Sequence, residues 1–159
     1  MITLDDVYCK FGEVSEAAQL LETELGTMLL LSGAVAEGFV TPTLEVDSEA
    51  ASEFLRQINR QTLGQLIRNA KRYTDALVRL EAVLFKALKE RNRLSHHFYR
   101  QHNFRRNSEE GRAIMLKDLE SIHETLLSAY KAVMLLSGTD LDALAAAGEP
   151  VLPTGHVPI

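Results

Sequence analysis

Three polar residues, Arg91, Asn92 and His96, lie within a stretch that otherwise has the pattern of an ordinary helix. An arginine stays positively charged and has five N–H donors, so it can hold a phosphate group and neutralise charge that develops on it. A histidine gains and loses protons near neutral pH and can act as a general acid or base. Asn92 and His96 are four residues apart, so they share a helix face. These residue types could carry acid–base chemistry on a phosphate-bearing ligand.

Arg91 also interrupts a regular apolar stripe. The stripe residues, separated mostly by three or four positions, are Leu77, Leu80, Leu84, Ala87, Leu94 and Phe98. This spacing predicts an amphipathic helix. At about 100° per residue, Arg91 lies about 20° from Leu80 around the helix axis, in the middle of the stripe. A guanidinium cannot be buried there without a partner, so Arg91 either serves a function or pairs with a carboxylate on another helix.

The same helix is expected to have two further faces. Phe85, Leu88 and Tyr99 surround Asn92 and His96 on a mixed apolar face. The third face is basic and comprises Lys86, Lys89, Arg93, His97 and Arg100. A helix that is apolar on two sides commonly has two packing partners, one of which can be a second subunit.

Arg91-Asn92-x-x-x-His96, in this helical setting, resembles the signature motif of the HEPN superfamily. The match in residues is confined to these three positions and Leu94, while the helical layout resembles the family as far as Gly138. HEPN proteins are small all-helical domains, commonly homodimers, and many are metal-independent endoribonucleases of toxin or defence systems. Some carry a tyrosine two residues after the histidine that a nucleotidyltransferase modifies. Phe98 stands there in this chain, so the resemblance does not imply that modification.

The resemblance implies an RNA-cleaving reaction without metal or other cofactor. Arg91 would hold the scissile phosphate, His96 would take the 2′-hydroxyl proton or protonate the leaving 5′-oxygen, and Asn92 would orient the imidazole. The residues expected to contact substrate are Arg93, His97, Tyr99 and Arg100. Because Arg91 and His96 lie about 140° apart around the helix, a symmetric dimer that brings two motifs together would focus them on one phosphate.

A second interpretation stays open at this point. In it the protein is a non-catalytic helical interaction or regulatory module, Arg91 pairs with a carboxylate, and the basic face binds an acidic partner. Exposure of Arg91 and His96 in one cleft at a subunit interface would favour the enzyme, whereas burial of Arg91 against an internal Asp or Glu would favour the module. The expected partners are a second copy of the chain, RNA, and an antitoxin or regulatory protein.

Histidines and acids elsewhere offer weaker patterns. His96, His97 and His102 have no i, i+4 spacing and no neighbouring Cys or Glu pattern of the zinc type. Glu120-x-x-His123 is a single copy of a motif that di-iron bundles use twice, together with further glutamates. We therefore expect no metal site.

Composition favours one helical domain. The chain has 159 residues, 46% of them hydrophobic, and a net charge of -5. The charge is uneven, because residues 86–106 hold seven Lys or Arg and one acid, which suits a phosphate-bearing ligand in one groove. A single cysteine, an N-terminus without the basic segment of a signal peptide, and apolar runs too short for a membrane span predict a cytoplasmic protein.

The periodicity predicts an all-α fold, an antiparallel four-helix bundle with a short C-terminal helix and an extended tail. The four helices are expected from Thr3 or Asp5 to about 37, from Asp47 or Ser48 with a break at 62–64, from 74–75 to about 102, and from Asn107 or Ser108 to Gly138. Residues 38–46 are expected to form a loop. The predicted domain covers 1–138, and 139–159 forms the short helix, over 139–147, and the tail.

Overall fold

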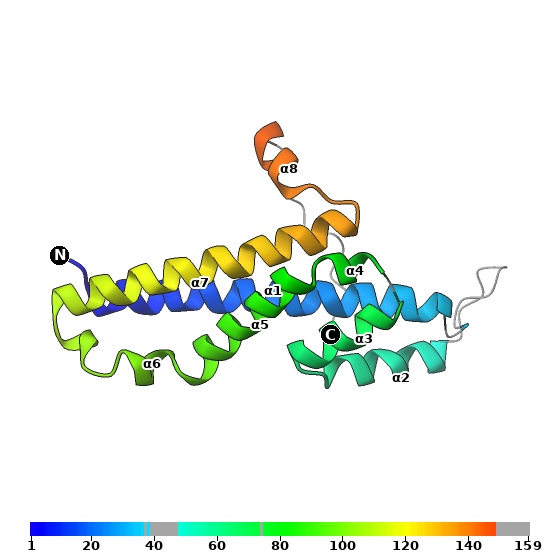
Figure 1. Ribbon diagram of the computed structural model, residues 1–159, viewed down its shortest axis with the longest axis horizontal. Coiled ribbons are helices and arrows are strands. Elements are labelled where there is room, and N and C mark those ends of the chain that lie inside the picture. Colours follow the sequence, from blue (N-terminus) through cyan, green and yellow to red (C-terminus); the bar gives the residue numbers. More distant parts are fainter. Residues whose placement is uncertain (37, 39–47, 74, 149–159) are drawn as a thin grey trace. The chain divides into compact units, whose positions relative to one another are not determined.

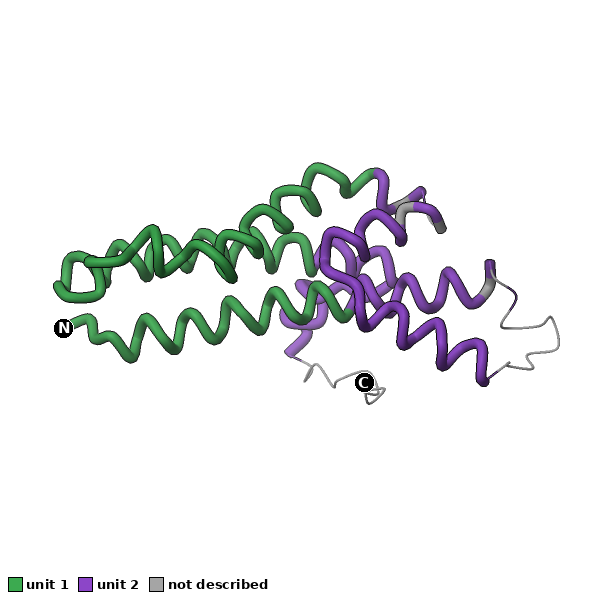
Figure 2. The backbone as a smooth tube through the Cα atoms, turned by 90° about the horizontal axis from the view of Figure 1, so that it is seen from below, with its two compact units in different colours: residues 1–23, 79–130 green, residues 24–78, 131–159 purple. Residues whose placement is uncertain are grey.

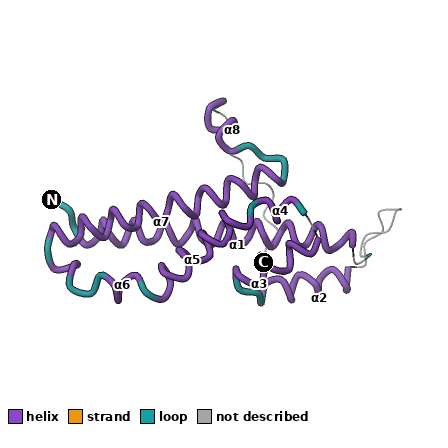
Figure 3. Tube along the Cα trace, viewed as in Figure 1, coloured by secondary structure: helices purple, strands orange, loops and turns teal. Residues whose placement is uncertain are grey.

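The computed structural model describes residues 1–36, 38, 48–73 and 75–148. Over these residues the chain is 86% helical and contains no β-strand (Figure 3), so the predicted all-α class is confirmed. The elements, labelled in Figure 1, are α1 (Leu4–Ala36), α2 (Ser48–Asn59), α3 (Leu63–Tyr73), α4 (Ala76–Arg79), α5 (Glu81–His96), α6 (Phe98–Gln101), the 3₁₀ turn η1 (Arg105–Asn107), α7 (Glu109–Leu136) and α8 (Leu141–Ala147).

Contacts between Cα atoms divide the chain into two compact units, which Figure 2 shows in different colours. Unit 1 comprises residues 1–23 and 79–130, and unit 2 comprises residues 24–78 and the chain from residue 131 onward. Every residue predicted to act on substrate lies in unit 1. No helix in the described ranges combines the length and the apolar character that crossing a membrane requires.

Unit 1 is built on the long helices α1 and α7, which pack together (Figure 1). Its core residues are at most 6% exposed and comprise Val7, Val14, Ala17, Ala18 and Leu21 of α1, Leu84, Ala87 and Leu94 of α5, Phe98 of α6, and Met115, Leu119, Ile122, Leu126 and Ala129 of α7. Of the apolar stripe predicted around Arg91, Leu84, Ala87, Leu94 and Phe98 are thus buried in unit 1, whereas Leu80 is only half-buried. Burying each large side chain contributes about 1.5–3 kcal/mol, which fixes the rotation of α5 about its axis.

Side-chain caps set the helix starts. The Thr3 hydroxyl accepts a hydrogen bond from the Asp6 backbone N–H (3.2 Å), and the Asp6 carboxylate accepts one from the Thr3 N–H (2.7 Å). At the start of α7, the Ser108 hydroxyl accepts a bond from the Gly111 N–H (3.0 Å). Such caps satisfy N–H groups that have no partner within the helix. The predicted caps Thr3 and Ser108 are confirmed. The break predicted at 62–64 is present but lies at 60–62, between α2 and α3.

The single helix predicted from 74–75 to 102 is wrong, because the chain is interrupted at Leu80 and His97. At His97 the backbone angles are φ -128° and ψ -18°. Hydrogen bonds continue on both sides, from the His97 N–H to the Arg93 carbonyl and from the Gln101 N–H to the His97 carbonyl, each 2.9 Å. The interruption is therefore a local distortion, and beyond it Phe98 and His102 are both buried.

In unit 2, α1 and α2 approach each other closely. A Cβ atom placed on Gly33 would lie only 2.5 Å from Cε1 and Cζ of Phe54, and one on Gly26 would lie 3.3 Å from Cγ2 of Ile58. The absence of a side chain at Gly33 thus makes room for an aromatic ring. This contact explains why a helix tolerates a residue that costs about 1 kcal/mol of helix propensity.

The C-terminal helix is present as predicted. Asp140 caps α8 by accepting hydrogen bonds from the N–H groups of Asp142 (3.1 Å) and Ala143 (3.0 Å). Gly138 and Gly148, which follow α7 and α8, have φ of 89° and 68°, a conformation that glycine adopts without steric cost. The predicted loop and tail lie outside the described residues, except for Gly38 and Gly148, as do the predicted cap Asp47 and the expected start of a helix at Thr74.

Candidate functional site

Arg91 lies on α5 and reaches toward α1. Its Nε donates a hydrogen bond to Oε1 of Glu22 at 2.7 Å, and its Nη1 donates a longer one to Oδ1 of Asn92 at 3.3 Å. The Arg91 and Glu22 side chains are 24% and 27% exposed, so the ion pair lies at the rim of the core. A carboxylate partner on another helix is one of the two alternatives that the interrupted stripe predicted. The pair fixes the plane of the guanidinium but uses only two of its five N–H donors.

Asn92 and His96 are both exposed on the neighbouring face of α5. No hydrogen bond joins them in the described part of the chain; the Asn92 carbonyl oxygen accepts from Arg91 instead. Neither ring nitrogen of His96 has a hydrogen-bond partner among the described residues, and the ring lies edge-on to His97 with centroids 6.3 Å apart. Arg91 and Asn92 are thus brought together, whereas the imidazole of His96 stays open to solvent and to a ligand.

Three aromatic side chains on the helices of unit 1 are exposed. Phe85 of α5 is 69% exposed, Tyr99 of α6 is 39% exposed and Tyr8 of α1 is 48% exposed. Phe11 packs beneath Tyr99 with ring centroids 5.1 Å apart. Partial burial raises the pKa of the Tyr99 hydroxyl, and Tyr8 adds to the effect. Phe85 and Tyr99, which the sequence assigns to the mixed face with Asn92 and His96, are therefore uncovered in a single copy.

Arg93 has more complete surroundings than Arg91. Its Nη1 and Nη2 donate to the two carboxylate oxygens of Asp118 on α7, at 2.7 and 2.9 Å, and its Nε donates to Glu90 at 2.8 Å. The bond to Asp118 raises the pKa of Arg93 and lowers the pKa of Asp118 in turn. Arg93, which was expected to contact substrate, is thus held between two carboxylates and joins α5 to α7.

His102 completes this network. It is 4% exposed, its Nε2 lies 2.8 Å from Asp118 Oδ2, and its Nδ1 lies 3.0 Å from Nη1 of Arg105. Arginine only donates, so Nδ1 is the acceptor toward Arg105 and the Nε2–H group donates to Asp118. The sequence offered one signal for this role, since His102 follows the buried Phe98 by four residues and so shares its face.

The remaining residues of the predicted basic face point to solvent. His97 ends α5 and Arg100 lies on α6, and both are exposed, as are Lys86 and Lys89. Neither His97 nor Arg100 has a side-chain hydrogen bond or ion pair within the described ranges. The predicted substrate contacts therefore divide into His97, Tyr99 and Arg100, which are accessible, and Arg93, which is engaged.

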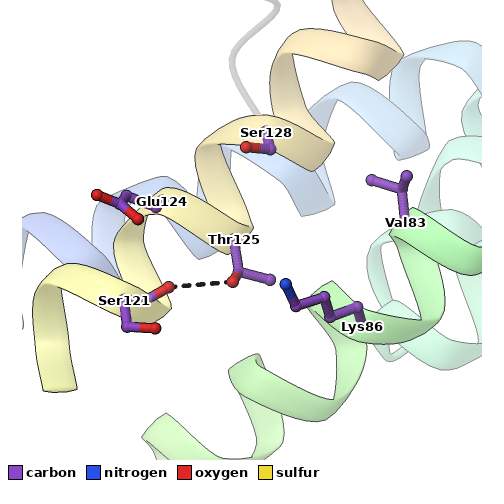
Figure 4. A pocket seen from close by; sticks show the side chains of 6 residues that line it. All are labelled: Val83, Lys86, Ser121, Glu124, Thr125 and Ser128. Carbon is purple, nitrogen blue, oxygen red and sulfur yellow. Dashed lines mark hydrogen bonds between the residues drawn. The ribbon is translucent and has the colours of Figure 1, made fainter.

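A hollow lies between α5 and α7, and Figure 4 shows it from close by. It is lined by Val83, Lys86, Ser121, Glu124, Thr125 and Ser128. Lys86 extends from α5 toward Thr125, whose hydroxyl donates to the Ser121 carbonyl at 3.0 Å. None of the predicted catalytic residues lines it, so this hollow does not add to the chemistry of Arg91 and His96.

Metal chemistry finds no support in the described parts of the chain, where no three His, Cys, Asp or Glu side chains gather closely enough to hold an ion. His123 is engaged with Lys10, whose Nζ lies 3.1 Å from its Nδ1. Burial lowers the pKa of His123, and the charge of Lys10 adds to this.

The chain was also compared with known proteins. No family model, no curated protein and no solved structure matches it. The resemblance to the HEPN superfamily therefore rests on Arg91, Asn92 and His96 and on their place in a small all-helical protein.

Proposed function

We propose that this protein is a HEPN-like, metal-independent endoribonuclease of the toxin or defence type, with the four-helix bundle of that family. The observation that carries the proposal is the state of the motif on α5. Glu22 orients the Arg91 guanidinium while three of its N–H donors stay available, and the His96 imidazole, five residues on in the same helix, has no partner among the described residues. An oriented cation and an open imidazole are the two groups that phosphoryl chemistry without metal needs.

The reaction is an internal transfer at the scissile phosphate. His96 takes the proton of the RNA 2′-hydroxyl, and the 2′-oxygen forms a bond to phosphorus while the bond from phosphorus to the 5′-oxygen breaks. The leaving 5′-oxygen receives a proton from a second acid. The products are a 2′,3′-cyclic phosphate and a 5′-hydroxyl. Arg91 stabilises the charge that develops on the phosphoryl oxygens, a role that contributes about 10²–10³-fold in comparable sites.

A homodimer supplies the second acid. Arg91 and His96 lie five residues apart on one helix and so point in different directions. The exposed Phe85 and Tyr99 flank the motif on a face that a second copy can cover. A two-fold axis through this face brings two Arg91–His96 pairs to one phosphate, with one histidine as base and the other as acid.

The first test is cleavage of a mixed RNA pool in EDTA by purified protein. Wild type is compared with Arg91→Ala and His96→Ala, and with Arg79→Ala as a matched control, because Arg79 is exposed and lies two residues before the start of α5. All variants are first checked for folding by circular dichroism and for mass by light scattering. Cleavage by wild type and Arg79→Ala alone, with cyclic phosphate ends detected by mass spectrometry, is the expected result. Equal cleavage by all four would refute the assignment of the site.

The dimer has its own test. Wild type is mixed with an excess of the double variant Arg91→Ala/His96→Ala, and the two are unfolded and refolded together so that mixed dimers form. A shared site that uses both histidines has only one in each mixed dimer, so the activity per wild-type chain is expected to fall. If the activity per wild-type chain stays unchanged although mixed dimers form, the two motifs do not act on one phosphate.

A second candidate function has one observation in its favour. The Glu22 carboxylate offsets the charge of Arg91, and a compensated arginine at the rim of a core is also what a structural ion pair looks like. We therefore propose, as the alternative, a non-catalytic module whose basic face binds an acidic antitoxin or regulatory protein. Absence of cleavage by wild type and all variants, together with capture of an acidic partner that charge reversal at Arg100 abolishes, would favour this function.

A further inference from the structure

A second hollow in unit 1 lies beside the Asp118–His102 network. From the chain between α5 and α7 it is lined by Gln101, His102 and Arg105, and from α7 by Lys117, Asp118 and Ser121, with Ile114 at its apolar edge. None of the three predicted catalytic residues takes part. Arg105 and Lys117 place a positive charge on each of its two sides. Both residues belong to unit 1.

The charges in this hollow are not balanced. Asp118 is its only carboxylate, and it already accepts two bonds from Arg93 and one contact from His102. Lys117 is exposed and has no hydrogen bond or ion pair among the residues that the structure describes. Arg105 uses one N–H on His102, which leaves its other donors. The hollow therefore offers N–H and O–H donors and a net positive charge, which is the donor set that a phosphate group requires.

Contacts on two sides hold Arg105 in place at the edge of the hollow. A Cβ atom on Gly111 would lie 2.0 Å from the Arg105 carbonyl oxygen, so the backbone of η1 rests directly on the first turn of α7. His102, 4% exposed, holds the guanidinium of Arg105 from the other side at 3.0 Å. A cation fixed before a ligand arrives loses little conformational entropy when it binds.

We infer that this hollow binds a phosphodiester group of single-stranded RNA, at a position separate from the scissile phosphate. The inference rests on the proposed function for its choice of RNA as the source of the phosphate. Arg105 and Lys117 contact the phosphate oxygens, and Gln101 and Ser121 supply neutral donors. The exposed Phe104, next to Arg105 and 79% exposed, gives a base of the same strand a surface on which to stack. The site thus lengthens the RNA footprint beyond the Arg91–His96 motif.

The test measures RNA binding apart from cleavage. Fluorescence anisotropy of a labelled single-stranded RNA is recorded in the His96→Ala background, which removes the proposed base. Lys117→Gln is added to this background, with Arg79→Gln as the control for loss of one exposed charge. We expect Lys117→Gln to weaken binding about threefold to tenfold and to make the dependence of log Kd on log salt shallower by about 0.7, the share of one phosphate on a single strand. Arg79→Gln is expected to leave both unchanged.

A calorimetric titration with AMP or inorganic phosphate distinguishes the sources of phosphate. Binding of either small ligand at micromolar concentration, lost in Lys117→Gln, together with no binding of RNA, would overturn the RNA assignment in favour of a small ligand. Equal RNA binding with and without Lys117 would overturn the site itself. Binding that depends on Lys117 in a protein that never cleaves RNA would support this inference while the proposed nuclease fails. If Lys117→Gln changes neither the KM nor the kcat of RNA cleavage, the proposed nuclease would stand and this inference would fail.

Discussion

Arg91 and Arg93 lie two residues apart on α5, and the structure treats them differently. Arg93 donates three hydrogen bonds to two carboxylates, from α5 itself and from α7, and lies beside a buried histidine. Arg91 donates one short bond to a carboxylate on α1 and one long bond to its neighbour Asn92. Their side chains have nearly equal exposure, 24% for Arg91 and 23% for Arg93.

The difference shows that exposure alone does not separate a structural arginine from a candidate catalytic one. What separates them is the number of donors that the protein itself satisfies. Arg93, with its donors engaged on two sides, ties α5 to α7 and has little left for a ligand. Arg91 is oriented but only partly engaged. The following substitutions test whether Arg93 acts mainly on stability and Arg91 mainly on activity.

The largest expected effect is on catalysis at Arg91. Arg91→Ala is expected to reduce kcat/KM for RNA by about 10²–10³-fold, because the group that stabilises charge on the phosphate is gone. Its free energy of unfolding, from urea denaturation, is expected to fall by less than about 1 kcal/mol, as for a partly exposed ion pair. An Arg91→Ala protein that loses stability as much as activity would end the distinction from Arg93.

Arg93→Ala is expected to show its main effect on stability. Removing the guanidinium leaves Glu90 and Asp118 close to each other without a cation, and the free energy of unfolding should fall by about 2 kcal/mol. Urea denaturation monitored by circular dichroism at pH 7 measures the change. Arg100 is an exposed arginine on α6 that has no partner in the described part of the chain, so Arg100→Ala is the matched control and should change stability by less than about 0.5 kcal/mol.

The pH dependence of stability provides a third comparison. The Arg93 bond holds the pKa of Asp118 below its ordinary value of 3.8 in the folded protein. As pH falls through about 4, the unfolded chain therefore takes up a proton at this position before the folded chain does, and the stability from Asp118 is progressively lost. Asp118→Asn should lower stability at pH 7 and flatten its decline between about pH 5 and pH 3. Parallel curves for wild type and variant would contradict the assigned role of Asp118.

The smallest effect is expected at Glu22. Glu22→Gln keeps an oxygen that accepts from the Arg91 Nε but removes the negative charge. Stability should change by less than about 1 kcal/mol, since the pair is partly exposed. RNA affinity in the His96→Ala background should hold or improve, because the positive charge of Arg91 is no longer offset. Weaker RNA binding by Glu22→Gln would mean that the carboxylate itself is needed to position the arginine.

Much of the fold could be predicted from the sequence because local signals carry it. The alternating stripes of α1, α5 and α7, the caps at Thr3 and Ser108, and the existence of a break between α2 and α3 each depend on residues close together in the chain. The interruption at His97 could not be predicted, since residues 65–110 contain no glycine or proline to mark it. It depends on the burial of Phe98 and His102, which is decided by tertiary packing.

The candidate site, too, could be predicted from the sequence only in part. The position of Arg91 within an apolar stripe predicted either a function or a carboxylate partner, but its partner Glu22 is 69 residues away and no local pattern specifies it. Asp118, which Arg93 and His102 share, likewise lies on another helix, where no local pattern specifies it. The sequence of α5 alone therefore could not distinguish Arg93 from Arg100. Spacing predicts which residues share a face; it does not predict which of them the rest of the chain will engage.

The contact between Gly33 and Phe54 in unit 2 limits which substitutions these two positions can accept. The two positions share one volume, so neither can change size alone without a clash or a void. Related chains should therefore show compensating pairs, in which a larger residue at 33 accompanies a smaller aliphatic one at 54. A larger residue at position 33 alone would destabilise the protein until position 54 also changes. Paired substitutions at these two positions would therefore report on descent and packing rather than on catalysis.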